Sequence, residues 1–218
     1  MVLFWLLLGL AIAVYLAAVY KEDLLAPGEA ETRAALQHLG PEYFVLNDLL
    51  LPSGGDPPTT QIDHVVVSKY GVFCVETKGF GGLILGNDRQ RTWRSYQGKN
   101  FTKFQNPVHQ NKWHLRALTI LVSRLGLDVK VTSLVSFPNA NSIEATSNEA
   151  FVGSARMVEV HIWDSNTQVL SESEVKLLVM EIENANITDP EIRGYHNLKV
   201  QAHVKRLRQN GLAPDDRY

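Results

Sequence analysis

Three charged residues interrupt two apolar segments of the sequence and are the first candidates for chemistry. Residues Gln61–Gly79 read QIDHVVVSKYGVFCVETKG, in which two β-branched runs flank a short break that contains glycine. This pattern is typical of a β-hairpin. The three charges are Asp63, Glu76 and Lys78. Charged groups are costly to bury among apolar residues, so we expect them to line a cleft.

The spacing of the hairpin predicts that the three charges share one face. With a two-residue turn at Tyr70-Gly71, Asp63 lies opposite Lys78. Asp63 and Glu76 are then diagonal neighbours, roughly 5–8 Å apart at Cβ. One divalent cation can bridge two carboxylates at that separation, with Lys78 beside it.

Two carboxylates and a lysine suit the hydrolysis of a phosphate ester. Mg²⁺, or Mn²⁺ in its place, takes oxygen ligands from one or two carboxylates, waters and substrate phosphate. A nearby ammonium can orient or help deprotonate the attacking water and neutralise charge that develops on the phosphate. The alternative is structural: Asp63 caps a strand, and Glu76 and Lys78 form an exposed cross-strand pair.

An Asp on one strand followed by Glu-x-Lys on the next resembles the PD-(D/E)XK nuclease core. Four motifs in order resemble the nuclease-related domain family: Gly28-Glu29, Gln61-Ile62-Asp63-His64, Gly71-Val72-Phe73 through Glu76-Thr77-Lys78-Gly79, and Asn106-Pro107-Val108-His109-Gln110. The resemblance runs from about Pro27 to Leu121. Ile62 stands where the family pattern has proline, which has no chemical role.

The resemblance implies a restriction-endonuclease-like fold and a metal site. Asp63 and Glu76 would bind the metal, with the carbonyl of Thr77 as an additional ligand, and Lys78 would position water. It also implies that Glu29 and Gln110 belong to the site. From the residues alone, Glu29 equally suits a partner of a helix dipole, and Gln110 equally suits a helix former.

A basic segment follows the hairpin. Between Asp88 and Arg116 there are seven Lys or Arg residues and one acid, a local charge of +6 in a chain of net charge −2. Such clustering favours contact with the phosphates of nucleic acid. The predicted nucleic-acid-binding residues are Arg89, Arg91, Arg94, Lys99, Lys103 and Lys112. Aromatic residues are interleaved with them, and we expect these mainly in the core: Trp93, Tyr96, Phe101 and Phe104.

Composition narrows the class of protein. At 218 residues, 45% hydrophobic and 20% charged, the chain suits one α/β domain. The acidic pI of about 6.4 argues against a protein that coats nucleic acid through bulk positive charge. The single cysteine, Cys74, excludes an intramolecular disulfide and a cysteine-rich zinc site. No GxxxxGK loop for ATP is present.

The first twenty residues predict a membrane anchor. Met1–Tyr20 contains no charged residue, and twenty helical residues span roughly the 30 Å core of a bilayer. Lys21, the first charge after it, favours a single-pass protein with its soluble domain in the cytoplasm. A cleaved signal peptide is the alternative. We divide the chain into an anchor (1–20), a linker (21–27), a nuclease-like domain (28–210) and a tail (211–218).

Local patterns predict an α/β domain with one mixed central sheet flanked by helices. Helices are expected from Glu29 to Leu39, from Pro107 to Leu125, from Ser171 to Asn184 and from Asp189 to Gln209. Strands are expected at Tyr43–Leu51, Leu83–Leu85, Thr92–Tyr96, Val129–Phe137 and Met157–Trp163, besides the hairpin, with a polar loop at Pro138–Asn148.

The sequence therefore predicts a membrane-anchored, Mg²⁺-dependent nuclease. The alternative from another class is a non-catalytic module that binds nucleic acid or another phosphate-bearing partner at the membrane. A lysine beside two carboxylates favours the enzyme, since a binding module does not require that combination.

Overall fold

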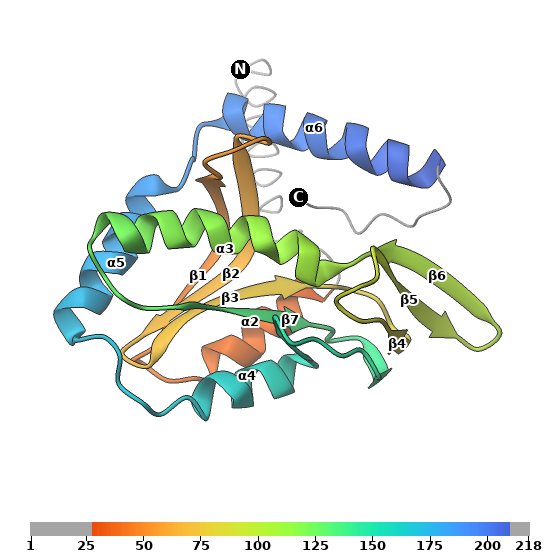
Figure 1. Ribbon diagram of the computed structural model, residues 1–218, viewed down its shortest axis with the longest axis horizontal. Coiled ribbons are helices and arrows are strands. Elements are labelled where there is room, and N and C mark those ends of the chain that lie inside the picture. Colours follow the sequence, from red (N-terminus) through yellow and green to blue (C-terminus); the bar gives the residue numbers. More distant parts are fainter. Residues whose placement is uncertain (1–27, 210–218) are drawn as a thin grey trace, which may run out of the picture.

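The computed structural model describes residues 28–209 and contains two β-sheets with helices on both faces of the larger one (Figure 1). The larger sheet has five strands in the order β1-β2-β3-β7-β9. β1, β2 and β3 are antiparallel neighbours, whereas β3, β7 and β9 run parallel. Their bounds are β1 Phe44–Pro52, β2 Thr59–Ser68, β3 Gly71–Thr77, β7 Val131–Ser136 and β9 Phe151–Gly153.

The predicted hairpin is formed by β2 and β3, but its register differs from the prediction. Ser68 pairs with Gly71 and Val67 with Val72, so the two turn residues are Lys69 and Tyr70. The turn at Tyr70-Gly71 was therefore wrong, and the pairing moves by two residues. A shift of two preserves the faces of both strands, because side chains alternate with period two.

Helices cover both faces of the larger sheet. α3 (Pro107–Arg124) and α5 (Glu172–Ala185) pack on one face, where Val65 and Cys74 meet Leu118 and Leu178. α2 (Glu29–Gln37) and α4 (Ala155–Trp163) pack on the other, against Val66, Phe73 and Val75. Figure 1 shows this arrangement, with the sheet between the α3 and α4 layers. β3 is buried along its whole length, which explains its nearly continuous apolar sequence.

The strands after Lys78 form a second sheet, so the expectation of a single central sheet was wrong. Its order is β6-β5-β4-β8, with β4 at Gly82–Leu85, β5 at Thr92–Gln97, β6 at Asn100–Gln105 and β8 at Ala140–Ile143. Trp93 and Phe104 are directly paired and fully buried, and they pack with Phe137 and Val135. This small core joins the second sheet to β7 of the first.

Further elements differ from the prediction: β6 and β9 were not expected as strands, and two segments were assigned to the wrong kind of element. Met157–Trp163 lies in helix α4, not in a strand: Ser154 caps the helix by accepting a hydrogen bond from the amide of Met157. Its buried apolar residues, Val158 and Ile162, are four residues apart, as on one helical face. The segment expected as a loop, Pro138–Asn148, contains β8, which pairs with β4.

The other helices agree with their sequence signals. Asn106 accepts a hydrogen bond from the amide of Val108 and caps α3, with Pro107 in the first turn. Ser171 and Glu174 form a capping box at the start of α5. The last helix, α6, spans Pro190–Gln209.

The membrane anchor predicted at Met1–Tyr20 lies outside the described residues. Within residues 28–209, no helix has both the length and the apolar character that crossing a bilayer requires.

Asn111 fastens α3 to the larger sheet. Its buried side-chain amide donates to the carbonyls of Cys74 and Leu134 and to the hydroxyl of Ser133, at 2.8–3.3 Å, and its Oδ1 accepts from the Cys74 thiol at 3.1 Å. One side chain thus links a helix to two neighbouring strands.

Replacing Asn111 by alanine should lower the free energy of unfolding by about 2–3 kcal/mol, because buried strand carbonyls lose their donor. Denaturant unfolding measures the change. The control is Lys112→Ala at the next position, where the side chain is half exposed and pairs with Glu149 at the surface. That change should cost under about 1 kcal/mol. Equal effects of the two substitutions would contradict the anchoring role of Asn111.

Candidate active site

A buried cluster of charged side chains lies at the carboxyl end of β3. The Lys78 ammonium contacts Oε1 of Glu76 at 2.9 Å, and Nε2 of His114 donates to Oε2 of the same carboxylate at 2.9 Å. All three side chains are about 1% exposed. The alternative of an exposed surface pair is therefore wrong.

Asp63 joins this cluster through the backbone. Its Oδ2 accepts a hydrogen bond from the amide of Thr77 at 2.7 Å. The last ladder pair before it is His64 with Val75, so the Asp63 carboxylate takes the place that a strand carbonyl would fill. The bond brings Asp63 to the segment between Glu76 and Lys78, and not to a position opposite Lys78 as the predicted register required.

Glu29 begins α2 beside the same strand ends and is 5% exposed. Gly28 before it has a φ of 100°, and a Cβ there would lie 2.8 Å from Pro138 and 3.3 Å from Cα of Gly79. Only glycine fits so close to the residue that follows Lys78. The structure thus places the start of α2, where Glu29 lies, next to the residue that follows Lys78.

Gln110 and His114 come from one face of α3. Both are buried, and they are four residues apart, which puts them on the same side of a helix. Nδ1 of His114 is hydrogen bonded to the hydroxyl of Thr60 on β2 at 2.7 Å. His114 therefore connects β2 to the Glu76 carboxylate.

His114 is the member of the cluster that sequence reasoning missed. His109 and His114 are five residues apart and so lie on different faces of a helix, which is why this pair did not indicate a site. The useful signal is the spacing from Gln110, because a helix that presents Gln110 to the site presents the residue four positions later as well. His109 instead points to the loop before β5, where its Nε2 is bonded to the carbonyl of Asp88 at 2.7 Å.

The electrostatics of the cluster keep Glu76 ionised. Burial raises the pKa of this carboxyl, but the Lys78 ammonium and the hydrogen bond from His114 outweigh burial and lower the pKa to about 2. The ionised carboxylate can bind a cation or accept a hydrogen bond from water, which a protonated carboxyl does less well.

The donor atoms of the cluster suit a hard cation. Asp63, Glu76 and the carbonyl of Thr77 supply oxygen only, as Mg²⁺ prefers. The Thr77 hydroxyl is buried with no hydrogen-bond partner within residues 28–209, which leaves an unsatisfied polar atom at the end of β3. No group of three or more His, Cys, Asp and Glu side chains in that range is arranged to hold a metal ion, so waters or substrate would complete the ligand set.

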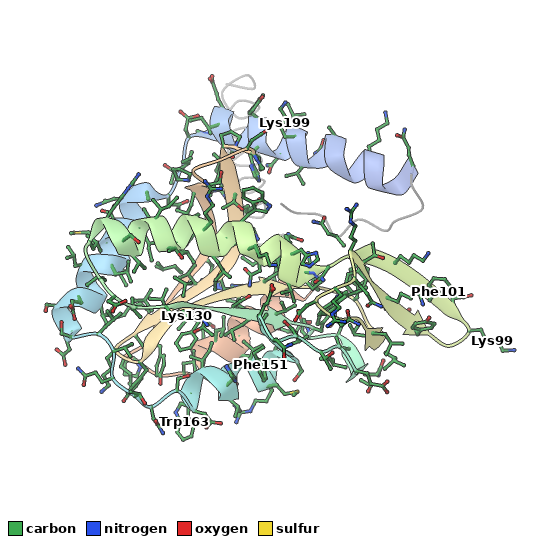
Figure 2. The ribbon with its side chains drawn as sticks, in the orientation of Figure 1. Lys99, Phe101, Lys130, Phe151, Trp163 and Lys199 are labelled. Carbon is green, nitrogen blue, oxygen red and sulfur yellow. The ribbon has the colours of Figure 1, made fainter. Side chains whose placement is uncertain are left out.

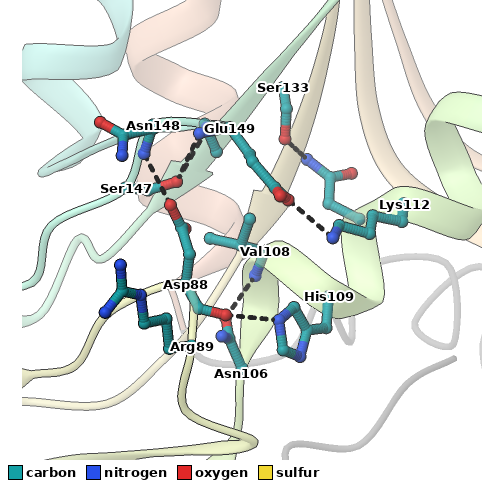
Figure 3. Close-up of polar contacts among 12 residues, drawn as sticks. Asp88, Arg89, Asn106, Val108, His109, Lys112, Ser133, Ser147, Asn148 and Glu149 are labelled. Carbon is teal, nitrogen blue, oxygen red and sulfur yellow. Dashed lines mark hydrogen bonds and ion pairs between the residues drawn. The ribbon is translucent and has the colours of Figure 1, made fainter.

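The six predicted nucleic-acid-binding cations lie mainly on the second sheet and its loops. Arg89, Arg91, Arg94 and Lys99 are exposed, and Lys103 is partly exposed. Lys112 on α3 pairs with Glu149 at 2.7 Å. Figure 3 shows this pair beside the contact of the Asn148 amide with Asp88, which holds the two loops against the start of α3.

The interleaved aromatic residues divide into two groups. Trp93 and Phe104 are fully buried, as predicted for core residues. Phe101 is half exposed, and Tyr96 beside it is partly exposed. The core prediction therefore fails for Phe101.

Comparison with known proteins identifies a family for about half of the chain. The profile of the nuclease-related domain family matches residues 25–138. An uncharacterized protein of Bacillus anthracis is 29% identical over 201 residues, which cover 89% of this chain and 94% of that protein. No solved structure matches the chain significantly. The matched residues include every member of the buried cluster.

The buried carboxylate predicts a pH dependence of stability. The pKa of Glu76 falls from its ordinary value of 4.5 to about 2 on folding. Between these values the unfolded chain binds more protons, so stability is lost as pH falls. Unfolding free energies of wild type should decline more steeply than those of Glu76→Gln there, by up to about 1.4 kcal/mol per pH unit.

The matched control for this experiment is Glu149→Gln, which removes a half-exposed carboxylate in a surface pair. Its pH profile should follow that of wild type. Parallel profiles for wild type and Glu76→Gln would mean that the Glu76 carboxyl is not held ionised by the fold.

Proposed function

Because the chain belongs to the nuclease-related domain family, we propose that it is a Mg²⁺-dependent nuclease that hydrolyses phosphodiester bonds of DNA or RNA. The observation that carries the proposal is the buried contact of Lys78 with Glu76, next to Asp63. Burial of several charges costs free energy that packing alone does not return, so clusters of this kind are concentrated at functional sites.

Three groups would hold the metal ion: the carboxylates of Asp63 and Glu76 and the carbonyl of Thr77. Mn²⁺, which shares the preference for oxygen ligands, would serve in place of Mg²⁺. When bound, the ion supplies Lewis-acid polarisation of the phosphate and lowers the pKa of water. Each oxygen of Glu76 already has a partner in Lys78 or His114, so ion binding at Glu76 requires that at least one of these contacts be shared or exchanged.

The protein groups have separate roles in this reaction. The Lys78 ammonium orients the attacking water and stabilises the negative charge that grows on the phosphate as the water oxygen bonds to phosphorus and the ester bond breaks. His114 fixes the orientation of Glu76 and is a positioning residue. Glu29 would accept a hydrogen bond from water at the site, and the amide of Gln110 would donate to water or to a phosphate oxygen.

The non-catalytic alternative rests on the same contacts. If Lys78 and His114 hold Glu76 permanently, the cluster is structural and the basic second sheet is a binding surface alone. The two readings differ in one measurable property, the dependence of cleavage on Glu76.

We also propose that Met1–Tyr20 anchors the protein to a membrane by a single span, with the nuclease-related domain in the cytoplasm. The support is the uncharged, strongly apolar composition of this segment and Lys21 directly after it.

Glu76→Gln should abolish Mg²⁺-dependent cleavage, because it removes a negative ligand with little change of shape. Lys78→Met should lower the turnover number by a factor of about 10²–10⁴, the range for a positioned electrostatic group. Cleavage of labelled single- and double-stranded DNA and RNA, with Mg²⁺ or with EDTA, measures both effects. Glu149→Gln is the control and should retain wild-type rates.

Removal of one partner from a buried ion pair costs about 3–5 kcal/mol, so the melting temperature of each variant is measured as well. The double variant Glu76→Gln/Lys78→Met removes both charges and should recover part of the lost stability while remaining inactive. Wild-type cleavage rates in folded Glu76→Gln would refute the nuclease proposal and favour the binding module.

The full-length protein should stay with membranes after high-salt and alkaline carbonate washes, whereas a fragment that begins at Pro27 should not. The physical reason is that a helix of twenty apolar residues does not leave the bilayer when ionic contacts are removed. Immunoblotting of the pellet and supernatant gives the result. Release of the full-length chain by carbonate would contradict the anchor, and an intact mass that lacks the first segment would indicate a cleaved signal peptide.

A further inference from the structure

The hairpin of β5 and β6 has one buried and one exposed face with different chemistry. Trp93 and Phe104 fill the core on the inner face. On the outer face, Arg94 is paired with Lys103 and Tyr96 with Phe101. The hairpin projects from the body of the protein, with Phe101 and Lys99 near its outer end (Figure 2).

Phe101 is exposed in a way that packing does not explain. Its side chain is 51% exposed, and Tyr96 lies beside it with ring centroids 5.4 Å apart. The guanidinium of Arg94 and the ammonium of Lys103 lie 5.6 Å and 6.0 Å from the centre of the Phe101 ring. One aromatic ring thus lies within about 6 Å of two neighbouring cations on the outer sheet face.

The two cations are themselves an unfavourable pair. Like charges directly opposite each other on antiparallel strands destabilise a sheet. Within residues 28–209, neither Arg94 nor Lys103 has a carboxylate at ion-pair distance. An anionic partner that lies across both cations would remove this repulsion.

A polar pocket adjoins this face. It has a volume of about 520 Å³, within the range of small-ligand pockets, and Arg91, Thr92, Arg94 and Glu144 are among its lining residues. Arg94 belongs both to the pocket and to the surroundings of Phe101. Cations next to an exposed aromatic ring suit single-stranded nucleic acid, because the strand offers phosphates and unpaired bases together.

The hairpin is firmly connected to the segment that carries Lys78. Phe80, two residues after Lys78, stacks on the inner-face Phe104 with ring centroids 4.1 Å apart. The hydroxyl of Ser95 donates to the carbonyl of Gly81 at 2.5 Å. A strand held on the outer face is therefore bound to a rigid extension of the candidate active site.

We propose that the outer face of the β5–β6 hairpin binds single-stranded nucleic acid by stacking an unpaired base on Phe101 while Arg94 and Lys103 contact the flanking phosphates. This inference rests on the proposed nuclease function and specifies its substrate class. In duplex nucleic acid the base faces are covered by their neighbours, so the ring contributes only to the single strand.

The test measures binding without cleavage, in full-length Glu76→Gln protein in detergent with EDTA. The probes are a fluorescent single-stranded oligonucleotide, a duplex of equal length, and an abasic single strand that keeps every phosphate and lacks the bases. Phe101→Ala should weaken binding of the normal single strand by about 5- to 150-fold, the equivalent of losing one base–aromatic stack. It should change duplex and abasic binding less than twofold.

Two matched variants separate stacking from other causes. Phe101→Leu keeps an apolar side chain without a ring and should behave like Phe101→Ala. Trp163→Ala removes another exposed aromatic, 65% exposed on α4, and should leave all three affinities unchanged. The salt dependence of binding should be the same with and without Phe101, because the ring neutralises no phosphate.

Equal losses on normal and abasic strands would overturn the proposal, as would unchanged binding of the normal strand by Phe101→Ala. Because these measurements need no catalysis, they test the binding role of the hairpin separately from the nuclease activity. Single-strand binding that depends on Phe101, together with wild-type cleavage by Glu76→Gln in Mg²⁺, would support the binding face and refute the catalytic role of Glu76. Lost cleavage in Glu76→Gln with unchanged binding in Phe101→Ala would support the nuclease proposal and refute the binding role of the hairpin.

Discussion

The negative charge of the buried Glu76 carboxylate must be balanced by nearby cations and hydrogen-bond donors, and the elements around it are arranged to supply them. A carboxylate at the end of a fully buried strand is stable only if cations and donors reach it through the surrounding layers. Lys78 comes from the same strand end, and His114 comes from α3, which crosses the sheet above it. The path of α3 is fixed by Asn111, whose amide is bonded to β3 and β7. The first half of α3 therefore makes polar contacts with the sheet, and its second half packs on the sheet through apolar side chains.

The two sheets divide the chemistry between them. The larger sheet ends in carboxylates and Lys78, whereas the smaller sheet and its loops carry the exposed cations Arg89, Arg91, Arg94 and Lys99. Three residues, Gly79 to Gly81, connect β3 and Lys78 to β4. This short connection keeps the carboxylates at the end of the larger sheet and the cations of the smaller sheet close together along the chain. In a chain that is slightly acidic overall, such a separation would give the phosphate backbone of the proposed substrate a local cationic surface that leads to the proposed metal ligands.

The sequence predicted the structure correctly where a residue type has one local role, such as capping a helix. Asn106-Pro107 and the Ser171–Glu174 box predicted helix starts that the structure contains. It failed where two periods fit the same residues: Val158, Val160 and Ile162 alternate like a strand, yet Val158 and Ile162 are the pair buried by α4. The hairpin register was wrong because glycine was assigned to the turn, whereas Gly71 is the first residue of β3. His114 was missed because its partners, Thr60 and Glu76, are 54 and 38 residues away in the chain.

Cys74 lies two residues before Glu76, at the point where α3 rests on the sheet. Burial raises the pKa of its thiol well above the ordinary value, and the thiol donates to Asn111. In the closed fold the sulfur is therefore both inaccessible and protonated, so alkylating reagents and oxidants cannot reach it. Since the sequence contains one cysteine, any modification of this protein at a thiol requires local or global unfolding that exposes the core around Cys74. The rate at which a reagent modifies this thiol therefore reports how often the core beside the buried cluster opens.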